Sequence, residues 1–162
     1  REVEQIKRDW VEMTLDKYKN EVPLKAGAKE FLDELKKREV KMGIATSNSR
    51  EIVHAVLSSL GVEDYFHQVL TSCDVKRGKP SPDIYLTCAE KLEVEPKNCL
   101  VFEDVVAGIL AGKRANMQVC AIEDAHSADV REEKKALADY YIKDYKNCQQ
   151  WFVGGKNENC NY

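Results

Sequence analysis

The stretch GIATSNSREIVHAVLSSLG, residues 43–61, decides the fold class. A short apolar run ends in polar residues, a segment with helical spacing of apolar residues follows, and Gly61 is a signal for the end of that helix. Strand, polar turn and helix in this order form the repeating unit of an α/β protein. The turn raises the question of what it holds, because its polar side chains are Thr46, Ser47, Asn48 and Ser49.

The alternation of strand and helix continues on both sides of this stretch. Helices are predicted over residues 2–20, 26–38, 50–60, 81–94, 105–116 and 130–138, and strands over 40–46, 66–72, 99–104, 117–122 and 140–142. Ser81 is expected to cap its helix, with Pro82 at the first helical position. Few charges in 40–46 favour a strand buried on both faces. The pattern predicts a doubly wound α/β fold with a mostly parallel sheet, in which ligands bind at the carboxyl ends of the strands.

Composition narrows the classes of function. The 162 residues suit about one domain, and 43% hydrophobic with 33% charged residues is typical of a globular protein. A net charge of −3 without a basic patch argues against nucleic acid, and no apolar stretch approaches the roughly 18 residues that cross a membrane. With no signal peptide and no C-x-x-C pair, we expect a cytoplasmic protein whose six cysteines are reduced thiols, rather than disulfides or zinc ligands.

Three polar groups stand where ligands are expected. Thr46, Ser47 and Asn48 follow the strand 40–46, and backbone amides with a hydroxyl at a strand-to-helix turn suit a phosphate oxygen. The alternative is an ordinary helix cap. Lys79, between Gly78 and Pro80, suits a phosphate or an aspartate that must stay charged, the alternative being a surface lysine of the loop.

An acidic pair ends the strand predicted at residues 99–104. Glu103 and Asp104 are adjacent, and the repulsion between two carboxylates would be relieved by a divalent cation. Oxygen ligands with retained water describe Mg²⁺. The alternative is that Asp104 caps the helix that follows.

The combination of these motifs is more specific than each alone. T-S-N at 46–48, G-K-P-x-P-D at 78–83 and F-E-D-x-x-x-G at 102–108 occur in this order after predicted strands. Over about residues 20–143 the sequence resembles the haloacid-dehalogenase-like phosphohydrolases, especially their β-phosphoglucomutase-like branch. Val105 departs from the Ser or Ala usual there, a change that could remove a hydrogen bond near the metal.

The resemblance implies a role for each motif. Thr46 would bind the phosphate with Ser47 and Asn48 in the adjoining turn, and Lys79 would stabilise the nucleophile and the phosphoryl group. Thr46 and Lys79 are therefore the catalytic candidates, and Glu103 with Asp104 would hold Mg²⁺. These assignments rest on the resemblance.

One element of the family is missing. Its chemistry uses an Asp-x-Asp pair at the end of an earlier strand, and no D-x-D occurs in the 162 residues. That strand would lie at the centre of the sheet, between 40–46 and 99–102. We therefore expect residues 1–20 to be the last helix of a truncated helical cap, 21–145 the core and 146–162 an irregular tail. A missing N-terminal segment, or another chain, would complete the sheet.

The implied function is that of a Mg²⁺-dependent phosphatase or phosphomutase. It would act through an aspartyl-phosphate on a small phosphate ester, by default a sugar phosphate, and this chain alone would be inactive. The alternative is a non-catalytic relative that binds phosphate or protein. A nucleotide-binding domain is disfavoured, because neither G-x-G-x-x-G nor G-x-x-x-x-G-K-[ST] occurs.

Overall fold

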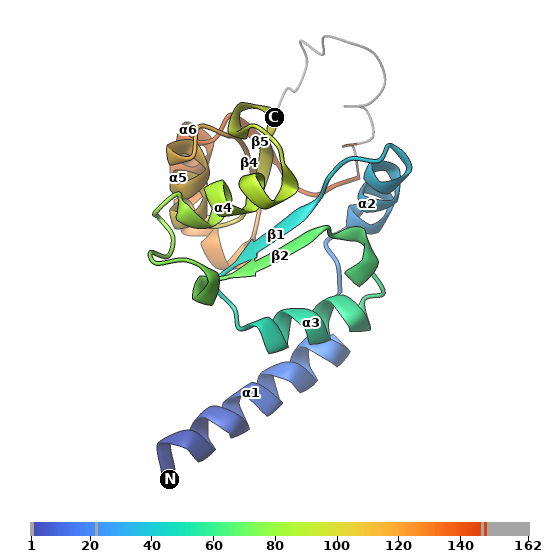
Figure 1. Cartoon of the computed structure of the whole chain (residues 1–162), viewed down its shortest axis with the longest axis vertical. Coiled ribbons are helices and arrows are strands. Elements are labelled where there is room, and N and C mark those ends of the chain that lie inside the picture. The colour runs from blue at the N-terminus through green and yellow to red at the C-terminus, as the bar shows by residue number, and fades with distance from the viewer. Residues whose placement is uncertain (1, 22, 147, 149–162) are drawn as a thin grey trace.

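The computed structural model describes residues 2–21, 23–146 and 148 (Figure 1). Its helices are α1 Glu2–Glu21, α2 Ala28–Lys37, α3 Arg50–Ser59, α4 Asp83–Leu92, α5 Val106–Arg114 and α6 Arg131–Leu137. Its strands are β1 Gly43–Thr46, β2 Gln68–Thr71, β3 Leu100–Glu103, β4 Gln118–Ile122 and β5 Tyr140–Ile142. Strands and helices alternate and every described strand pairing is parallel, which confirms the α/β class.

The described strands form two sheets. β1 pairs with β2, and the second sheet has the order β3-β4-β5. No pairing between described residues joins β1 to β3, so both strands keep an unpaired edge where the sequence leads us to expect a further strand. The expected doubly wound sheet is thus present in two parts.

The core is divided by the first sheet into two clusters. Ile44 and Val69 pack with Val53 of α3, whereas the next residue of each strand, Ala45 and Leu70, packs in the larger cluster around α4 and α5. This alternation follows from the two-residue period of a strand. Helices therefore cover both faces of the β1–β2 sheet.

The prediction of a strand over 40–46 buried on both faces is wrong in two respects. The strand is only Gly43–Thr46, in which Gly43 is exposed and Ile44, Ala45 and Thr46 are partly exposed. Val40, before the strand, is 39% exposed. Because β1 has one paired edge in the described chain, helices on both faces do not bury it completely.

An aromatic cluster ties the segment after β5 to α2 and β3. The ring centroids of Phe31, Phe102 and Tyr145 lie 5.5–5.6 Å apart. The Tyr145 amide donates to the Ala26 carbonyl at 2.9 Å. Gly27 has φ 76°, and a Cβ there would lie 2.5 Å from the Lys146 backbone nitrogen. The chain after β5 therefore packs closely against the start of α2.

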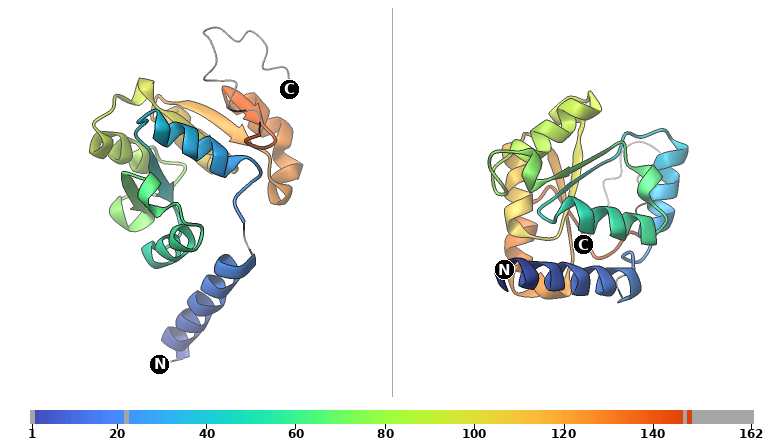
Figure 2. Two further views of the ribbon diagram at one scale, coloured as in Figure 1. Left: turned by 90° about the vertical axis from the view of Figure 1, so that its right-hand side faces the viewer. Right: turned by 60° about the horizontal axis from the view of Figure 1, so that its bottom comes forward.

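Helix α1 lies against α3 and projects from the rest of the protein (Figures 1 and 2). The helix is as predicted, but its apolar side chains Val3, Ile6 and Met13 are 54–66% exposed. None of the described helices, α1 included, is long and apolar enough to cross a membrane. The assignment of 1–20 to a cap and 21–145 to a core remains a prediction, and most of the expected 146–162 tail lies outside the described residues.

Of the two helix ends predicted from the sequence, the end of α3 is confirmed and the start of α4 is wrong. Gly61, with φ 65°, follows the last residues of α3 as predicted. The Ser81 cap of α4 is wrong: Pro82 holds the N-cap position without a side-chain bond, and Ser81 Oγ instead donates to Asp83 Oδ1 at 2.8 Å. The Ser81 hydroxyl thus bonds to a side chain in the first turn of α4 and caps no backbone amide of that helix.

The described cysteines agree with the expectation of reduced thiols at three positions. Cys73, Cys88 and Cys99 are free, and Cys160 lies outside the described residues. Burial raises the pKa of the Cys88 thiol to about 11. That thiol therefore stays protonated at neutral pH.

Candidate active site

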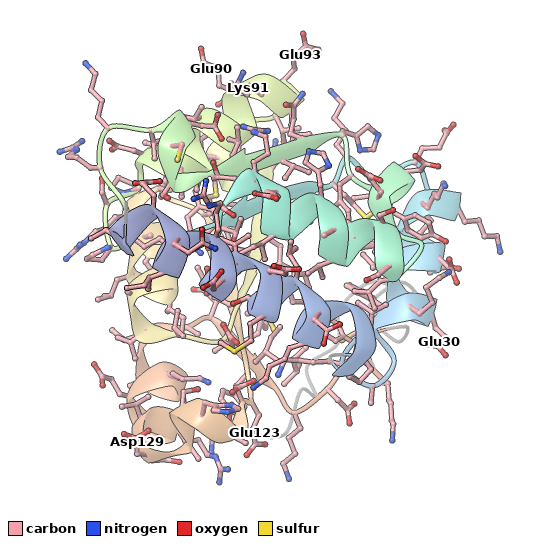
Figure 3. The ribbon with its side chains drawn as sticks, turned by 90° about the horizontal axis from the view of Figure 1, so that it is seen from below. Glu30, Glu90, Lys91, Glu93, Glu123 and Asp129 are labelled. Carbon is pink, nitrogen blue, oxygen red and sulfur yellow. The ribbon has the colours of Figure 1, made fainter. Side chains whose placement is uncertain are left out.

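The carboxyl ends of the strands lie on one side of the protein. Glu123, directly after β4, is on the opposite side from Glu93 at the end of α4 (Figure 3). Lys41, just before β1, donates to the Leu92 carbonyl at 2.7 Å, so the end of α4 marks the amino ends of the strands. All sequence-predicted site residues lie toward the other edge.

The turn after β1 leaves three polar residues in front of α3. Ser49 is the N-cap of α3, and its Oγ accepts a hydrogen bond from the Ile52 amide at 3.4 Å. Thr46 Oγ1 accepts from the Asn48 amide at 3.1 Å. Because Ser49 caps the helix, residues 46–48 are not needed for that task, and the partial positive charge of the helix end favours an anion beside them.

Asp74 braces this turn from the end of β2. Its two carboxylate oxygens each accept from Arg50 Nη2 at 2.7 Å, and Oδ2 also accepts from the Thr71 amide at 2.7 Å. The hydrogen bond from the Thr71 amide lowers the pKa of Asp74. Ser72 Oγ, in the same short 3-10 helix, lies 3.5 Å from the Ser47 carbonyl to which it donates. The turn is therefore held by the Asp74 carboxylate through Arg50 and Thr71.

Lys79 reaches from the loop before α4 to the ends of both sheets. Its Nζ donates to the Ala45 carbonyl of β1 at 3.2 Å and forms an ion pair with Glu103 of β3. Only 12% of its side chain is exposed, so it does not extend into solvent as a surface lysine would. One ammonium group thus joins the carboxyl ends of two strands that do not pair with each other.

Glu103 is buried in a fixed environment. Its Oε1 accepts hydrogen bonds from Lys79 and from the Tyr85 hydroxyl. Burial, assisted by the Glu103 carboxylate, raises the pKa of Tyr85, so this hydroxyl stays protonated and donates. Gly108 in α5 leaves the space for this carboxylate, since a Cβ there would overlap its atoms. The need to leave room for the Glu103 carboxylate therefore explains why the F-E-D-x-x-x-G motif has a glycine at position 108.

Asp104 differs from its neighbour. Its carboxylate forms no hydrogen bond or ion pair within the described part of the chain, while its carbonyl accepts from Ser127 Oγ at 3.0 Å. The alternative that Asp104 caps α5 is wrong, because Val105 is the N-cap and makes no side-chain cap bond. The Asp104 carboxylate is thus left available for another ligand.

The acidic pair has the donor chemistry of part of a Mg²⁺ site. Glu103 has one oxygen committed to Lys79 and Tyr85, and both carboxylate oxygens of Asp104 lack a partner among the described residues. Mg²⁺ commonly binds one or two carboxylates and keeps several waters beside a substrate phosphate. Among the described residues no group of three or more His, Cys, Asp or Glu side chains is placed to hold a metal. The donor chemistry fits the acidic half of such a site, and the other ligands must come from elsewhere.

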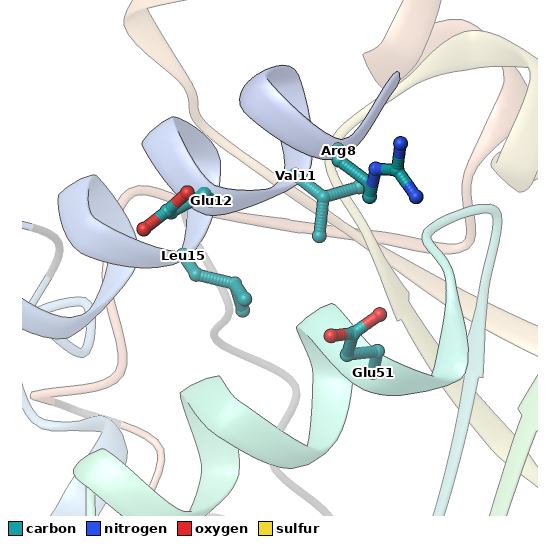
Figure 4. Close-up of a pocket in the computed structure, with 5 residues that line it drawn as sticks. All are labelled: Arg8, Val11, Glu12, Leu15 and Glu51. Atoms are coloured by element: carbon teal, nitrogen blue, oxygen red, sulfur yellow. The ribbon is translucent and has the colours of Figure 1, made fainter. Parts of the chain in front are cut away.

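A hollow of about 370 Å³ lies between α1 and α3 (Figure 4). It is lined by Arg8, Val11, Glu12, Leu15 and Glu51. Glu51 belongs to the first turn of α3, which begins directly after the polar turn 46–49. The hollow therefore borders the helix end that faces the candidate phosphate position.

Sequence reasoning overlooked Tyr85, Ser127 and Lys134. Tyr85 stands in the first turn of α4, shortly after Lys79, and this spacing was the available signal. Lys134 Nζ donates to Ser127 Oγ at 2.9 Å and to the Ile122 carbonyl at 2.7 Å. Contacts to backbone carbonyls leave no pattern of residue types, so no signal in the sequence pointed to these two.

A hydroxyl-bearing turn, a buried lysine and an acidic pair thus lie at the carboxyl edge of a parallel α/β fold, where such folds bind their ligands. The chain belongs to the haloacid dehalogenase-like hydrolase family, whose model matches residues 1–122. This confirms the resemblance stated from the three motifs.

The chain is similar to phosphatases and phosphomutases. Validoxylamine A 7'-phosphate phosphatase of Streptomyces hygroscopicus subsp. limoneus is 39% identical over 128 residues, covering 79% of this chain and 58% of that protein. Crystallised CbbY mutant from Rhodobacter sphaeroides in complex with xylulose-(1,5)bisphosphate has a TM-score of 0.80 at 25% identity, covering 90% of this chain and 65% of that one. β-Phosphoglucomutase (pgmB) from Clostridium difficile has a TM-score of 0.74 at 26% identity, covering 93% and 62%. This chain thus spans less than two thirds of each of these proteins.

Proposed function

We propose that this chain forms the phosphate- and metal-binding part of a Mg²⁺-dependent phosphatase or phosphomutase that acts on a small phosphate ester. The observation that carries the proposal is the Lys79 ammonium, which contacts Ala45 at the end of β1 and Glu103 at the end of β3. The names of the relatives, among them a β-phosphoglucomutase and a validoxylamine phosphate phosphatase, support sugar phosphates and similar esters as the first substrates to test.

The phosphate would lie in front of the α3 N-terminus. Thr46 would donate its hydroxyl and Ser47 its backbone amide, Asn48 in the adjoining turn would hold Thr46 Oγ1 in place through its own amide, and Lys79 would balance the negative charge. Phosphoryl transfer asks a protein mainly for positioning and for stabilisation of charge, and this set of groups supplies both.

Glu103 and Asp104 would hold Mg²⁺. Asp104, without another partner, suits a direct ligand, whereas Glu103, bonded to Lys79 and Tyr85, suits an indirect role through water. Bound Mg²⁺ would neutralise charge on the phosphate oxygens. The remaining tasks, which are to place the phosphate and to keep the attacking group ionised, belong to the residues of the chain.

The attacking carboxylate would come from a strand that is not among these 162 residues. The unpaired edges of β1 and β3 offer backbone groups for such a strand, and Lys79 lies between them. An aspartate beside this ammonium would stay ionised. Its oxygen would bond to phosphorus as the ester oxygen leaves, and water would then cleave the aspartyl-phosphate to phosphate and the free aspartate.

A second candidate function is binding without catalysis. The absence of Asp-x-Asp from the sequence favours a relative that keeps a phosphate or protein site. The ordered Lys79–Glu103 pair favours the enzyme, because a buried ion pair is costly to keep without a task.

A chimera separates the two functions. The N-terminal part of the Streptomyces validoxylamine phosphatase that precedes its similarity to this chain is joined to residues 1–162, and sugar phosphates are tested with Mg²⁺. We expect hydrolysis or phosphoryl transfer that is lost in Lys79→Met but kept in Lys76→Met, an exposed lysine of the same loop. A folded chimera that binds phosphate without turnover would support the binding module instead.

A further inference from the structure

Lys134 is the largest fully buried side chain in the described chain, with 1% exposure. Its Nζ donates to the Ile122 carbonyl at 2.7 Å and to Ser127 Oγ at 2.9 Å, and it forms no ion pair with a described carboxylate. Burial lowers the pKa of this ammonium. The negative charge of Asp104 acts in the opposite direction and raises the pKa more than any other nearby carboxylate does. A charged group thus lies beneath the carboxyl edge of the second sheet.

The hydrogen bonds of Lys134 continue to Asp104. An ammonium group only donates, so the Ser127 oxygen accepts from it, and the single Ser127 proton goes to the Asp104 carbonyl at 3.0 Å. Ser127 stands at a non-helical break, φ −126° and ψ 27°, within the 3-10 helix Ala125–Val130. Lys134 therefore donates to Ser127, and Ser127 in turn donates to the Asp104 carbonyl.

We propose that Lys134 is a positioning residue for the candidate metal ligand Asp104 and that it acts through Ser127. The inference rests on the proposed function, because it takes Asp104 as a ligand of the cation. The Asp104 carboxylate has no hydrogen-bond partner in the described chain, so its place depends on its backbone. Ser127 holds that backbone, and Lys134 ties Ser127 to Ile122 at the end of β4.

The physical cost of a buried ammonium argues for a specific task. An apolar side chain of similar length would fill the same space without loss of hydration. Lys134 also brings positive charge toward Asp104, and that charge alone repels a cation. Electrostatics alone therefore predicts that Lys134→Met tightens cation binding, whereas a positioning role predicts that it weakens binding.

The experiment measures Mn²⁺ binding to the 162-residue chain by NMR. Mn²⁺ broadens the amide signals near its site even when it binds weakly, and the signals of residues 103–106 are followed during the titration. Lys134→Met and Ser127→Ala should each weaken the affinity about tenfold or more, with no further loss in the double variant. Lys135→Met, the matched change at the next residue of α6, should leave the affinity unchanged because its Nζ pairs with Glu132 at 3.2 Å and lies over the Tyr141 ring, away from Ser127 and Asp104.

Each outcome has a defined meaning. Unchanged or tighter binding in a folded Lys134→Met or Ser127→Ala variant, while Asp104→Asn abolishes binding, overturns the positioning role and leaves the proposed metal site standing. Ser127→Ala decides the question if Lys134→Met does not fold. Wild-type binding in Asp104→Asn, or no broadening near residue 104 in the wild-type chain, contradicts the metal site itself and the inference with it.

Discussion

Gly108→Ala tests the packing on which the acidic pair depends. In most helices this change is favourable, because alanine has the higher helix propensity. Here the added Cβ would overlap the carboxylate of Glu103, which Lys79 and Tyr85 hold from the other side. We therefore expect the substitution to destabilise the protein.

The size of the effect follows from three contributions. Displacement by an extra methyl group in a packed site costs about 1–3 kcal/mol. Loss of the Tyr85 hydrogen bond to the charged Glu103 costs about 1.5–3 kcal/mol, and the gain in helix propensity returns at most about 1 kcal/mol. The free energy of unfolding should fall by about 2–5 kcal/mol, a large part of the 5–15 kcal/mol typical of a domain.

Urea denaturation followed by circular dichroism measures this change. Gly78→Ala is the matched control, because a Cβ there meets nothing within 4 Å, and it should change the free energy of unfolding by less than about 0.5 kcal/mol. The double variant Gly108→Ala with Glu103→Ala should have the same free energy of unfolding as Glu103→Ala alone, because the clash partner is gone. If Gly108→Ala stabilises the protein as propensity suggests, the Glu103 carboxylate does not occupy this position and the reasoning is refuted.

Three further predictions concern stability, pH and activity. Tyr85→Phe should lower the free energy of unfolding by about 1–3 kcal/mol, since it removes a donor to a buried carboxylate, and an unchanged urea midpoint would contradict the bond. The hydrogen bond from Lys25 lowers the pKa of Asp124 to about 2 from 3.8, so its stabilisation is present above pH 3.8 and is lost as the pH falls from there toward about 2. Lys25→Met should flatten that part of a melting-temperature profile, and an identical profile would disprove the role of Lys25. The purified 162-residue chain should not hydrolyse p-nitrophenyl phosphate with Mg²⁺, because it has no Asp-x-Asp, and turnover that survives purification would show another nucleophile.

The elements of the fold were predictable because their signals are local. Apolar runs of strand length, helical periodicity and the glycine after α3 each depend on a few adjacent residues. Thr46 and Glu103 end β1 and β3 and Lys79 follows β2, and parallel strands bring their carboxyl ends to one edge. The approach of Lys79 to Glu103 is a consequence of this topology.

What escaped the sequence depends on contacts between distant segments. β1 is partly exposed because one of its edges is unpaired among the described strands. No residue type in the sequence indicates that an edge is unpaired. Ser81 donates to the Asp83 carboxylate, and Pro82 rather than Ser81 is the N-cap of α4, a shift of one residue that the sequence pattern does not record. In the sequence, Lys134 looks like an ordinary charged residue of a helix. Only the fold shows that its Nζ bonds to Ser127 Oγ.

Phosphate binding by the 162-residue chain is the most direct test of the central claim, that the carboxyl edge holds a phosphoryl group. The ¹⁵N-labelled protein is titrated with inorganic phosphate in the presence of Mg²⁺, and the amides of Ser47 and Asn48 are observed. We predict that both amides shift and that Lys79→Met weakens the affinity at least about tenfold, which is about 1.4 kcal/mol, while Lys76→Met does not. Amides that do not move, or that move equally in Lys79→Met, would contradict the account.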